Sequence, residues 1–326
     1  MDRLLIIRYG GFGDALQAAS ILPHLKGRGF HITWDTSEQG FEVLRSDRLI
    51  DALLITPAGS VPEEALPEYW NARSNGFNQV INLCESVEND SLLLPTRLGF
   101  YHDDATRRRL YGDVNYVERI HAVAGVAGPF LPRYCASDDE LRAAAGSVAG
   151  APAVVLCLAG SAEYKVWPHA GSFACRLLEA TGARLFLAGG IRDAHLAQAV
   201  LSLVGDARPG DLGRVVDLTS APIRQTLAIS SLAAAVVGPE TGITNAVAGF
   251  SNRKVVLLSH SSPRNLTAHW RNTVAIEPSV ACHPCHRLHQ TTKFCPRGPS
   301  GFAACADAVQ PEDVLVHVVI ALETAP

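Results

Sequence analysis

Short apolar segments alternate with helix-forming segments along the whole 326-residue chain, and no other feature of the sequence restricts the fold as strongly. In the first half, helical periodicity is found at residues 14–26, with a predicted kink at Pro23, and at residues 114–126. The predicted strands of this half are residues 3–9, 30–36, 51–57 and 79–84. Strands that alternate with helices form a parallel sheet covered on both faces. The first half is therefore predicted to be an α/β domain.

The alternation restarts at residue 153, after a stretch bounded by "GPFLPRY" and "GSVAGAPA" that we predict to be a linker with little regular structure. The predicted strands are residues 153–160, 183–190, 215–219, 233–239 and 254–259, and the predicted helices are residues 170–181, 192–204, 222–232, 242–249 and 311–323. The fold class is therefore α/β, with two doubly wound, Rossmann-like domains, residues 1–150 and 151–326, facing a central cleft. In such sheets, ligands bind beyond the carboxyl ends of the strands.

The composition narrows the function classes. Hydrophobic residues make up 48% of the chain, charged residues 18%, and the net charge is −4, a balance that is typical of a soluble globular protein and gives no basis for nucleic-acid binding. No apolar run reaches the length of a membrane span, and the apolar segment before Gly10 is too short for a signal peptide. We therefore expect a cytoplasmic protein without a transmembrane segment.

The loop after the first predicted strand, Gly10-Gly11-Phe12-Gly13-Asp14, lies where a ligand is expected. It lacks the G-x-G-x-x-G spacing of a dinucleotide-binding turn. Asp14 stands at the start of the helix, where it either caps the helix or offers its carboxylate to a substrate. The second interpretation depends on the neighbouring glycines, which carry no side chains that would hinder a substrate.

Three loops of the second half follow predicted strands in the same way. "GSAEYKVWPHA" (160–170) contains a lysine able to pair with a phosphate, and "LAGGIRD" (187–193) has two glycines that let a ligand approach the backbone. In "VVGPETGITNAVAGF" (236–250) a strand ends and a helix begins, and the N–H groups of a helix start bind anions. Helix capping and ordinary strand-to-helix turns are the alternative explanations for these loops.

Taken in this order, the four loops resemble those of the heptosyltransferases, family 9 of the glycosyltransferases, whose architecture is GT-B. The family's opening strand-Gly-Asp-helix loop matches "RYGGFGDALQAASILPHLK", its K-x-W-P motif matches "KVWP" (165–168), and its D-T-G-hydrophobic-x-H loop is matched by "ETGITN" (240–245). The resemblance covers nearly the whole chain. Two positions depart from the family pattern, because Glu240 replaces the usual Asp and Asn245 the usual His.

By this resemblance the chain is an inverting glycosyltransferase that moves a sugar, expected to be heptose, from a nucleotide-diphosphate sugar, expected to be ADP-heptose. Asp14 is the implied general base on the acceptor hydroxyl, and Lys165 offsets charge on the leaving diphosphate, with no catalytic metal or other catalytic cofactor. The implied donor-binding residues are Gly13, Ser161, Gly189, Glu240, Thr241, Gly242 and Thr244. Two alternatives stay open, a sugar-nucleotide-binding protein without transfer activity and a GT-B nucleotide-sugar epimerase.

Other charged segments are less informative. The acidic segments "HDD" (102–104) and "SDDE" (137–140) are predicted to be solvated and not to bind a metal. Residues 107–109, three consecutive arginines, correspond loosely to the acceptor side of the family. A lipid-linked acceptor would bring the protein to a membrane surface as a peripheral protein.

Four of the eight cysteines lie in residues 281–306, with the spacing C-x2-C-x9-C-x9-C. This spacing suits a structural Zn or Fe site, and reduced cysteines or a disulfide are the alternative. The predicted ligands are Cys282, Cys285, Cys295 and Cys305, with His283, His286 and His289 as replacements. Family members that glycosylate autotransporter proteins resemble this arrangement and bind iron. The resemblance therefore leaves two acceptors open, a lipopolysaccharide core sugar and a protein Ser or Thr.

Overall fold

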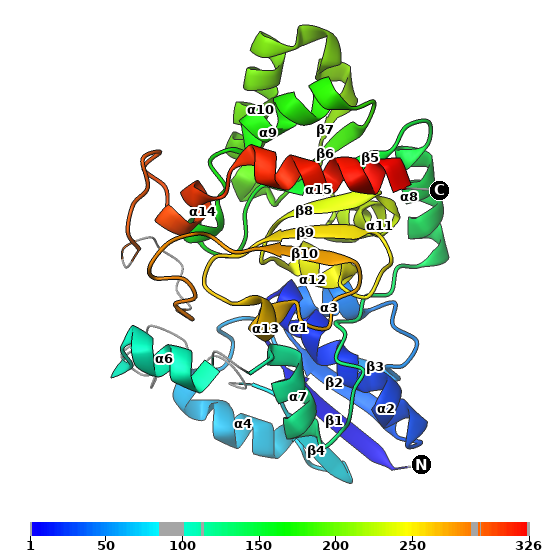
Figure 1. Ribbon diagram of the computed structural model, residues 1–326. Helices are drawn as coiled ribbons and strands as arrows, with labels where there is room; N and C mark the ends of the chain where they lie inside the picture. The colour runs from blue at the N-terminus through cyan, green and yellow to red at the C-terminus, as the bar shows by residue number, and fades with distance from the viewer. Residues whose placement is uncertain (1, 85–100, 112–113, 288–292, 294, 325–326) are drawn as a thin grey trace.

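The computed structural model describes residues 2–84, 101–111, 114–287, 293 and 295–324. These residues form two parallel sheets flanked by helices, one in each half of the chain (Figure 1). The smaller sheet has the strand order β3-β2-β1-β4, and the larger has the order β10-β9-β8-β5-β6-β7. The predicted α/β architecture with two Rossmann-like sheets is confirmed.

The elements alternate along the chain as expected. The strands are β1 (Arg3–Arg8), β2 (His31–Thr36), β3 (Ala52–Ile55), β4 (Gln79–Asn82), β5 (Ala153–Cys157), β6 (Arg184–Ala188), β7 (Val215–Asp217), β8 (Ala235–Pro239), β9 (Arg253–Leu257) and β10 (Thr273–Ile276). The helices of the first half are α1 (Phe12–Ala18), η1 (Ala19–Ile21), α2 (Leu22–Gly27), α3 (Glu38–Leu44), η2 (Glu63–Ala65), α4 (Leu66–Arg73), α6 (Asp104–Tyr111), α7 (Tyr116–Ala124) and α8 (Asp138–Val148). Those of the second half are η4 (Glu163–Lys165), α9 (Ala170–Ala180), η5 (Ile191–Asp193), α10 (Ala194–Ala207), η6 (Pro209–Arg214), α11 (Ile223–Leu232), α12 (Gly242–Val247), α13 (Pro263–Leu266), α14 (Ala304–Ala308) and α15 (Pro311–Thr324).

Every predicted strand is present, and the main differences concern helices. The single helix expected at residues 14–26 is divided into α1, the short 3-10 helix η1 and α2. Pro23 lies in the first turn of α2, where its missing N–H breaks no helical hydrogen bond. The α-helix is therefore interrupted at η1, before Pro23.

The prediction of little regular structure between residues 128 and 152 is wrong for α8. Ser137 caps this helix by accepting from the Glu140 N–H, and the Glu140 carboxylate accepts from the Ser137 N–H in return. This is the capping box of the S-x-x-E pattern, so "SDDE" is a helix start and not simply a solvated acidic segment. α8 packs against α11, which follows β7 of the larger sheet. The division at residue 150 stays a prediction.

The two halves share apolar packing. One buried cluster begins with Leu4 in β1, continues through Leu16 of α1 and Ile243 of α12, and reaches Val155 in β5 of the larger sheet. A second cluster fills the space between the larger sheet and α9, α10 and α15. The halves are therefore joined by packed side chains as well as by the linker. Within the described ranges, no helix is long and apolar enough to cross a membrane.

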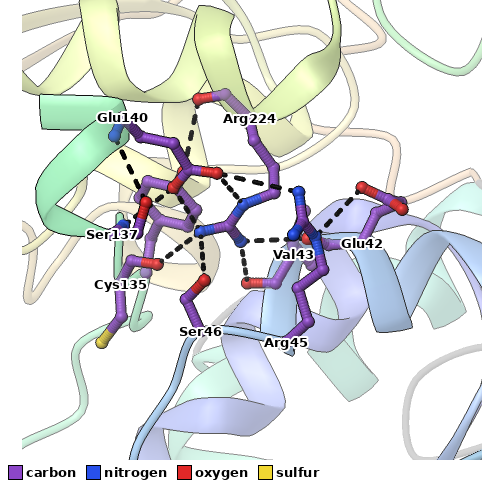
Figure 2. Close-up of polar contacts among 9 residues, drawn as sticks. Glu42, Val43, Arg45, Ser46, Cys135, Ser137, Glu140 and Arg224 are labelled. Carbon is purple, nitrogen blue, oxygen red and sulfur yellow. Dashed lines mark hydrogen bonds and ion pairs between the residues drawn. The ribbon is translucent and has the colours of Figure 1, made fainter. Parts of the chain in front are cut away.

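Polar contacts at the linker converge on Arg224 of α11, whose side chain is buried (Figure 2). Its guanidinium donates to both carboxylate oxygens of Glu140 at 2.5 and 2.6 Å and to the Cys135 carbonyl at 3.0 Å. It also donates to Ser46 Oγ at 2.9 Å and to two carbonyls at the C-terminal end of α3. Because α3 belongs to the first half, this Arg224 cluster (Arg224, Glu140, Ser46, the Cys135 carbonyl and the α3 carbonyls) fixes the linker to both halves.

Candidate active site between the two sheets

The loops beyond β1 and β8 meet between the two sheets, where α1 and α12 pack against each other (Figure 1). Each loop leads directly into its helix, so the first turn of α1 carries Asp14 and the first turn of α12 carries Thr244 into the same region. This is the carboxyl edge of both sheets, where the fold places ligands.

Asp14 is held from two sides. Its Oδ2 accepts from the Gly11 N–H at 2.8 Å, and its Oδ1 lies 3.1 Å from Nη2 of Arg8, a buried residue at the end of β1. Gly10 has φ +107°, and a Cβ there would lie 2.6 Å from Asp14 Oδ2, so this position requires glycine. The Asp14 side chain is still 39% exposed. Asp14 therefore caps α1 and also presents its carboxylate to solvent. That it meets a substrate there stays a prediction.

Lys165 reaches the same region from η4 in the second half. Its side chain is buried, with 8% exposed, and Nζ donates to the Glu240 carbonyl at 2.9 Å. Its aliphatic part packs over Gly160, where a Cβ would lie only 2.6 Å from Lys165 Cδ. Burial lowers the pKa of Lys165, and the charges of Glu240 and Asp14 act in the opposite direction. The predicted base and the predicted counter-charge therefore interact across the two halves.

The Glu240 carboxylate points into the protein. Oε1 accepts from the backbone N–H of Ser259 at 2.7 Å and of Ser261 at 3.4 Å, and Oε2 lies 3.2 Å from His260 Nε2. Burial alone would raise the pKa of Glu240, but the charges of His260 and Lys165 and the Ser259 N–H lower it on balance. Glu240 thus fixes the loop after β8 to the loop after β9. In this arrangement only its backbone carbonyl contacts Lys165.

The threonines after Glu240 cap α12. Thr241 Oγ1 accepts from the Ile243 N–H at 3.1 Å and the Thr244 N–H at 3.4 Å, while Thr244 Oγ1 accepts from the Thr241 N–H at 3.0 Å. Thr244 is fully buried. The capping explanation is therefore confirmed, and a phosphate bound here would have to displace or supplement these bonds.

The other predicted donor-binding residues lie at the surface of the same edge. Ser161, after β5, is exposed, and Gly189, at the end of β6, is partly exposed. The Gly190 N–H donates to Asp193 Oδ2 at 2.8 Å, which repeats the bond between Gly11 and Asp14. Both turns have the sequence Gly-Gly-x-x-Asp, a local pattern that predicts the same cap at both helix starts.

Gly13 and Gly242 lie at the contact between α1 and α12. A Cβ on Gly242 would come within 3.2 Å of the Gly13 nitrogen. Gln17 of α1, which the sequence analysis missed, donates to Asn245 Oδ1 at 3.0 Å. The family pattern has His at this position. The Asn245 side chain that stands there in this chain therefore has a hydrogen-bond partner in the other half.

The four cysteines of residues 281–306 lie close enough to influence one another. Burial raises the pKa of Cys285 to about 11 and of Cys305 to about 12, and the neighbouring thiols contribute to both shifts. All four are free of disulfides. Among the described residues, no group of three or more His, Cys, Asp or Glu side chains is arranged to hold a metal ion, and His289 lies outside those residues. The Zn or Fe site stays a prediction, and no step of the reaction below depends on it.

The Cys-rich segment is docked on α6 of the first half. Arg108 donates to the carbonyls of Pro284 at 2.9 Å and Ala281 at 3.0 Å, and Arg287 makes two hydrogen bonds to the Asp104 carboxylate at 2.9 and 2.8 Å. The arginines that the family resemblance associates loosely with the acceptor side therefore include one that binds this segment. No local sequence pattern predicts these contacts.

Comparison with known proteins gives matches among solved structures only. No protein-family model matches the chain, and no curated protein matches it. The ADP-heptose lipopolysaccharide heptosyltransferase II of E. coli superposes with a TM-score of 0.69 at 16% identity, covering 99% of each chain. A glycosyl transferase of family 9 from Veillonella parvula gives 0.70 at 13% identity, covering 100% of this chain and 99% of the other.

A third match is the iron-containing dodecameric glycosyltransferase TibC from enterotoxigenic E. coli. Its TM-score is 0.60 at 16% identity, over 99% of this chain and 79% of TibC. Identities this low establish the fold alone. The chain therefore has the GT-B fold of these glycosyltransferases, and the resemblance inferred from the motifs holds at the level of the fold.

Proposed function

We propose that this chain is an inverting glycosyltransferase that moves heptose from ADP-heptose to a hydroxyl of a lipopolysaccharide core sugar or of a protein Ser or Thr. The first half, residues 1–150, carries the acceptor side, and residues 151–326 bind the nucleotide-sugar donor. The proposal is supported by the shared fold, by the order of the motifs and by neighbours that include an ADP-heptose heptosyltransferase.

The observation that carries the proposal is that Asp14 lies in α1, which packs against α12, while Lys165 of the other half bonds to the Glu240 carbonyl just before α12. Asp14 is partly exposed and oriented by Arg8 and Gly11, while Lys165 is buried and its Nζ is held by a backbone carbonyl. A carboxylate on one wall and an ammonium on the other match what transfer from a nucleotide diphosphate requires, namely a proton acceptor and a counter-charge.

The reaction follows from these roles. Asp14 accepts the proton of the acceptor hydroxyl as that oxygen attacks the anomeric carbon of the donor. The bond between this carbon and the diphosphate oxygen breaks, and the leaving diphosphate takes the electron pair. Lys165 offsets its charge, with Ser161 and the backbone at Gly189 and Gly242 as further donor contacts. Attack opposite the leaving group inverts the anomeric configuration, and no catalytic metal takes part in this scheme.

The test is acceptor-dependent release of ADP from ADP-heptose, measured with core oligosaccharide and with protein acceptors. Replacing Asp14 by Ala should lower kcat at saturating donor by about 10²–10⁴-fold while leaving the affinity for ADP unchanged, because the carboxylate acts on the acceptor. Lys165→Ala should weaken ADP binding and turnover together. Turnover by Asp14→Ala close to that of the wild type would show that another group takes the proton.

Asp193 provides a matched control. It accepts a glycine N–H at the same 2.8 Å distance as Asp14 does. Asp193→Ala should therefore lose the same capping bond without the loss of kcat at saturating donor, and it should cost less thermal stability than Asp14→Ala, which also removes the ion pair with buried Arg8. Donor binding without transfer to any acceptor would instead favour a binding protein, and conversion of the sugar nucleotide without an acceptor would favour an epimerase.

A further inference from the structure

The Lys165 ammonium takes its direction from a backbone carbonyl. Nζ donates to the Glu240 carbonyl at 2.9 Å. The side chain passes over Gly160, where a Cβ would lie 2.6 Å from Lys165 Cδ and 3.4 Å from the Glu240 carbonyl oxygen, so these three groups are packed together. An ammonium has three N–H donors, and the bond to the carbonyl therefore limits where the other two can point.

The Glu240 carbonyl is in turn held by the side chain of the same residue. Glu240 lies between the end of β8 and Thr241, the N-cap of α12. Its carboxylate reaches the loop after β9, the neighbouring strand of the sheet (Figure 1), where Oε1 accepts from the N–H groups of Ser259 at 2.7 Å and Ser261 at 3.4 Å. Oε2 lies 3.2 Å from His260 Nε2. The position of the carbonyl therefore depends on residues of another loop.

Glu240 also supplies a counter-charge for Lys165. Both side chains are buried, and an unpaired charge in the interior of a protein is costly. Burial lowers the pKa of Lys165, and the charges of Glu240 and Asp14 act in the opposite direction. A diphosphate bound to Lys165 would take over this counter-charge, so the bound state needs the bonds that Glu240 makes more than it needs its charge.

We propose that Glu240 and His260 are positioning residues that direct the Lys165 ammonium toward the donor diphosphate. The Glu240 carboxylate acts through the backbone carbonyl of its own residue, and His260 holds the second oxygen of that carboxylate. Neither side chain contacts the donor in this assignment. The inference rests on the proposed function, because it assigns both residues to the diphosphate that Lys165 binds.

The length of the Glu240 side chain accounts for Glu at a position where the family pattern has Asp. From the same backbone, an aspartate carboxylate is one methylene shorter and stops short of the Ser259 N–H, which lies 2.7 Å from Oε1 of Glu240. A charge directed at the donor would be kept by Asp and lost in Gln. A bond to the loop after β9 is kept by Gln and lost in Asp. The two substitutions therefore distinguish positioning from direct donor binding.

The affinity for ADP, measured by isothermal titration calorimetry, is the first test. Glu240→Asp should weaken ADP binding about tenfold, because it removes a hydrogen bond to a charged group. Glu240→Gln should stay within about threefold of the wild type, because its amide oxygen still accepts from Ser259 and Ser261. ADP binding by Glu240→Asp as tight as that by Glu240→Gln, or tighter, would overturn the proposal.

A double substitution tests whether Glu240 acts through Lys165. In the Lys165→Ala protein, Glu240→Asp should cause no further loss of ADP affinity, because the carbonyl then has no ammonium to position. A further loss of about tenfold would show that Glu240 contacts the donor itself, and this result would also overturn the proposal.

His260 is tested by steady-state kinetics. His260→Leu should raise KM for the donor about three- to tenfold and leave KM for the acceptor unchanged, and His260→Gln, which keeps a side-chain donor, should restore the wild-type values. Both variants keep the His260 carbonyl, which accepts from the His286 N–H at 2.8 Å. A purely structural effect would lower the active fraction, and with it kcat, without changing KM. An unchanged KM for the donor in His260→Leu would therefore contradict the role of His260.

Glu118→Gln is the matched control. Glu118 of α7 lies 2.6 Å from His269 Nε2, so this variant alters a Glu–His pair outside the loops of the candidate site. The affinity for ADP and KM for the donor should both stay at the wild-type value. A loss equal to that in His260→Leu would contradict the proposal, because the effect would then not be specific to the contacts of Lys165.

The outcomes separate this inference from the proposed function. A wild-type protein that neither binds ADP nor transfers a sugar to any acceptor would contradict the proposed function, and this inference with it. Transfer by the wild type, together with ADP binding by Glu240→Asp that equals that of the wild type, would contradict the positioning role alone.

Discussion

Replacing Arg224 by Met tests whether the Arg224 cluster joins the two halves. Arg224 is 2% exposed and binds both oxygens of the Glu140 carboxylate, and these bonds lower the pKa of Glu140 to about 2 despite its partial burial. Relative to an ordinary value of 4.5, this shift corresponds to about 3 kcal/mol, of which the Ser137 N–H supplies a part that the variant keeps. The variant also leaves carbonyls of α3 and of Cys135 without this donor. We expect the free energy of unfolding at pH 7 to fall by about 3–5 kcal/mol.

The pH dependence of this stability loss shows whether the ion pair between Arg224 and Glu140 causes it. A carboxyl whose pKa is lowered by folding adds stability above its unfolded pKa and loses that contribution as the pH falls through the folded value. For Glu140 this loss occurs as the pH falls from 4.5, its ordinary pKa, to about 2, its pKa in the folded protein. The difference between wild type and Arg224→Met should therefore narrow by about 1–2 kcal/mol between pH 7 and pH 3.

Urea unfolding followed by circular dichroism at both pH values measures this difference. Arg176→Met is the matched control, because it removes the same group from an exposed pair with Glu312 and should cost less than about 1 kcal/mol. A loss below about 1 kcal/mol for Arg224→Met, or a loss that is the same at pH 7 and pH 3, would refute the reasoning.

Three further predictions concern Lys254, Gly10 and the predicted metal site. Burial lowers the pKa of Lys254 to about 8, so its unfolded state binds the proton more tightly and wild-type stability rises from pH 8 to above pH 10. Lys254→Met should therefore raise the free energy of unfolding at pH 7 by about 1–2 kcal/mol after loss of the bond to the Phe250 carbonyl, and with it the melting temperature. A lower melting temperature would contradict this. Gly10→Ala should displace the Asp14 carboxylate and lower kcat far more than ADP affinity, as steady-state kinetics and calorimetry would show. Metal analysis should find one Zn or Fe per chain that is lost in Cys282→Ser, and wild-type protein without metal would exclude the predicted site.

Much of the fold could be predicted because it depends on local patterns. Apolar segments of strand length identified all the strands except β10, which is a partly buried edge strand of only four residues. The capping box at Ser137 and Glu140 was equally local, and it was missed only because the acidic residues were interpreted as a solvated segment. Where this prediction failed, the signal for a helix start was present in the same few residues.

The site could be predicted in position and less well in orientation. The rule that ligands bind at the carboxyl edge of a parallel sheet brought Asp14 and Lys165 to the same region. The direction of the Glu240 side chain depends on the backbone of Ser259 and Ser261, which belongs to the loop after another strand. A carboxylate in a motif indicates which chemistry is available. The direction of its side chain depends on hydrogen-bond donors that lie elsewhere in the chain.

Asn245 shows how such distant partners change the meaning of a motif. If only its own loop is considered, the replacement of the family's His by Asn245 suggests altered binding of the sugar donor or lost activity. In the structure its amide accepts from Gln17, 228 residues away, and donates to the Thr241 carbonyl. The amide supplies an acceptor and a donor side by side, so Asn at this position suits a contact between α1 and α12. The departure is therefore better explained by the way the two halves meet than by the loss of a donor ligand, and Gln17 is the residue whose substitution distinguishes the two explanations.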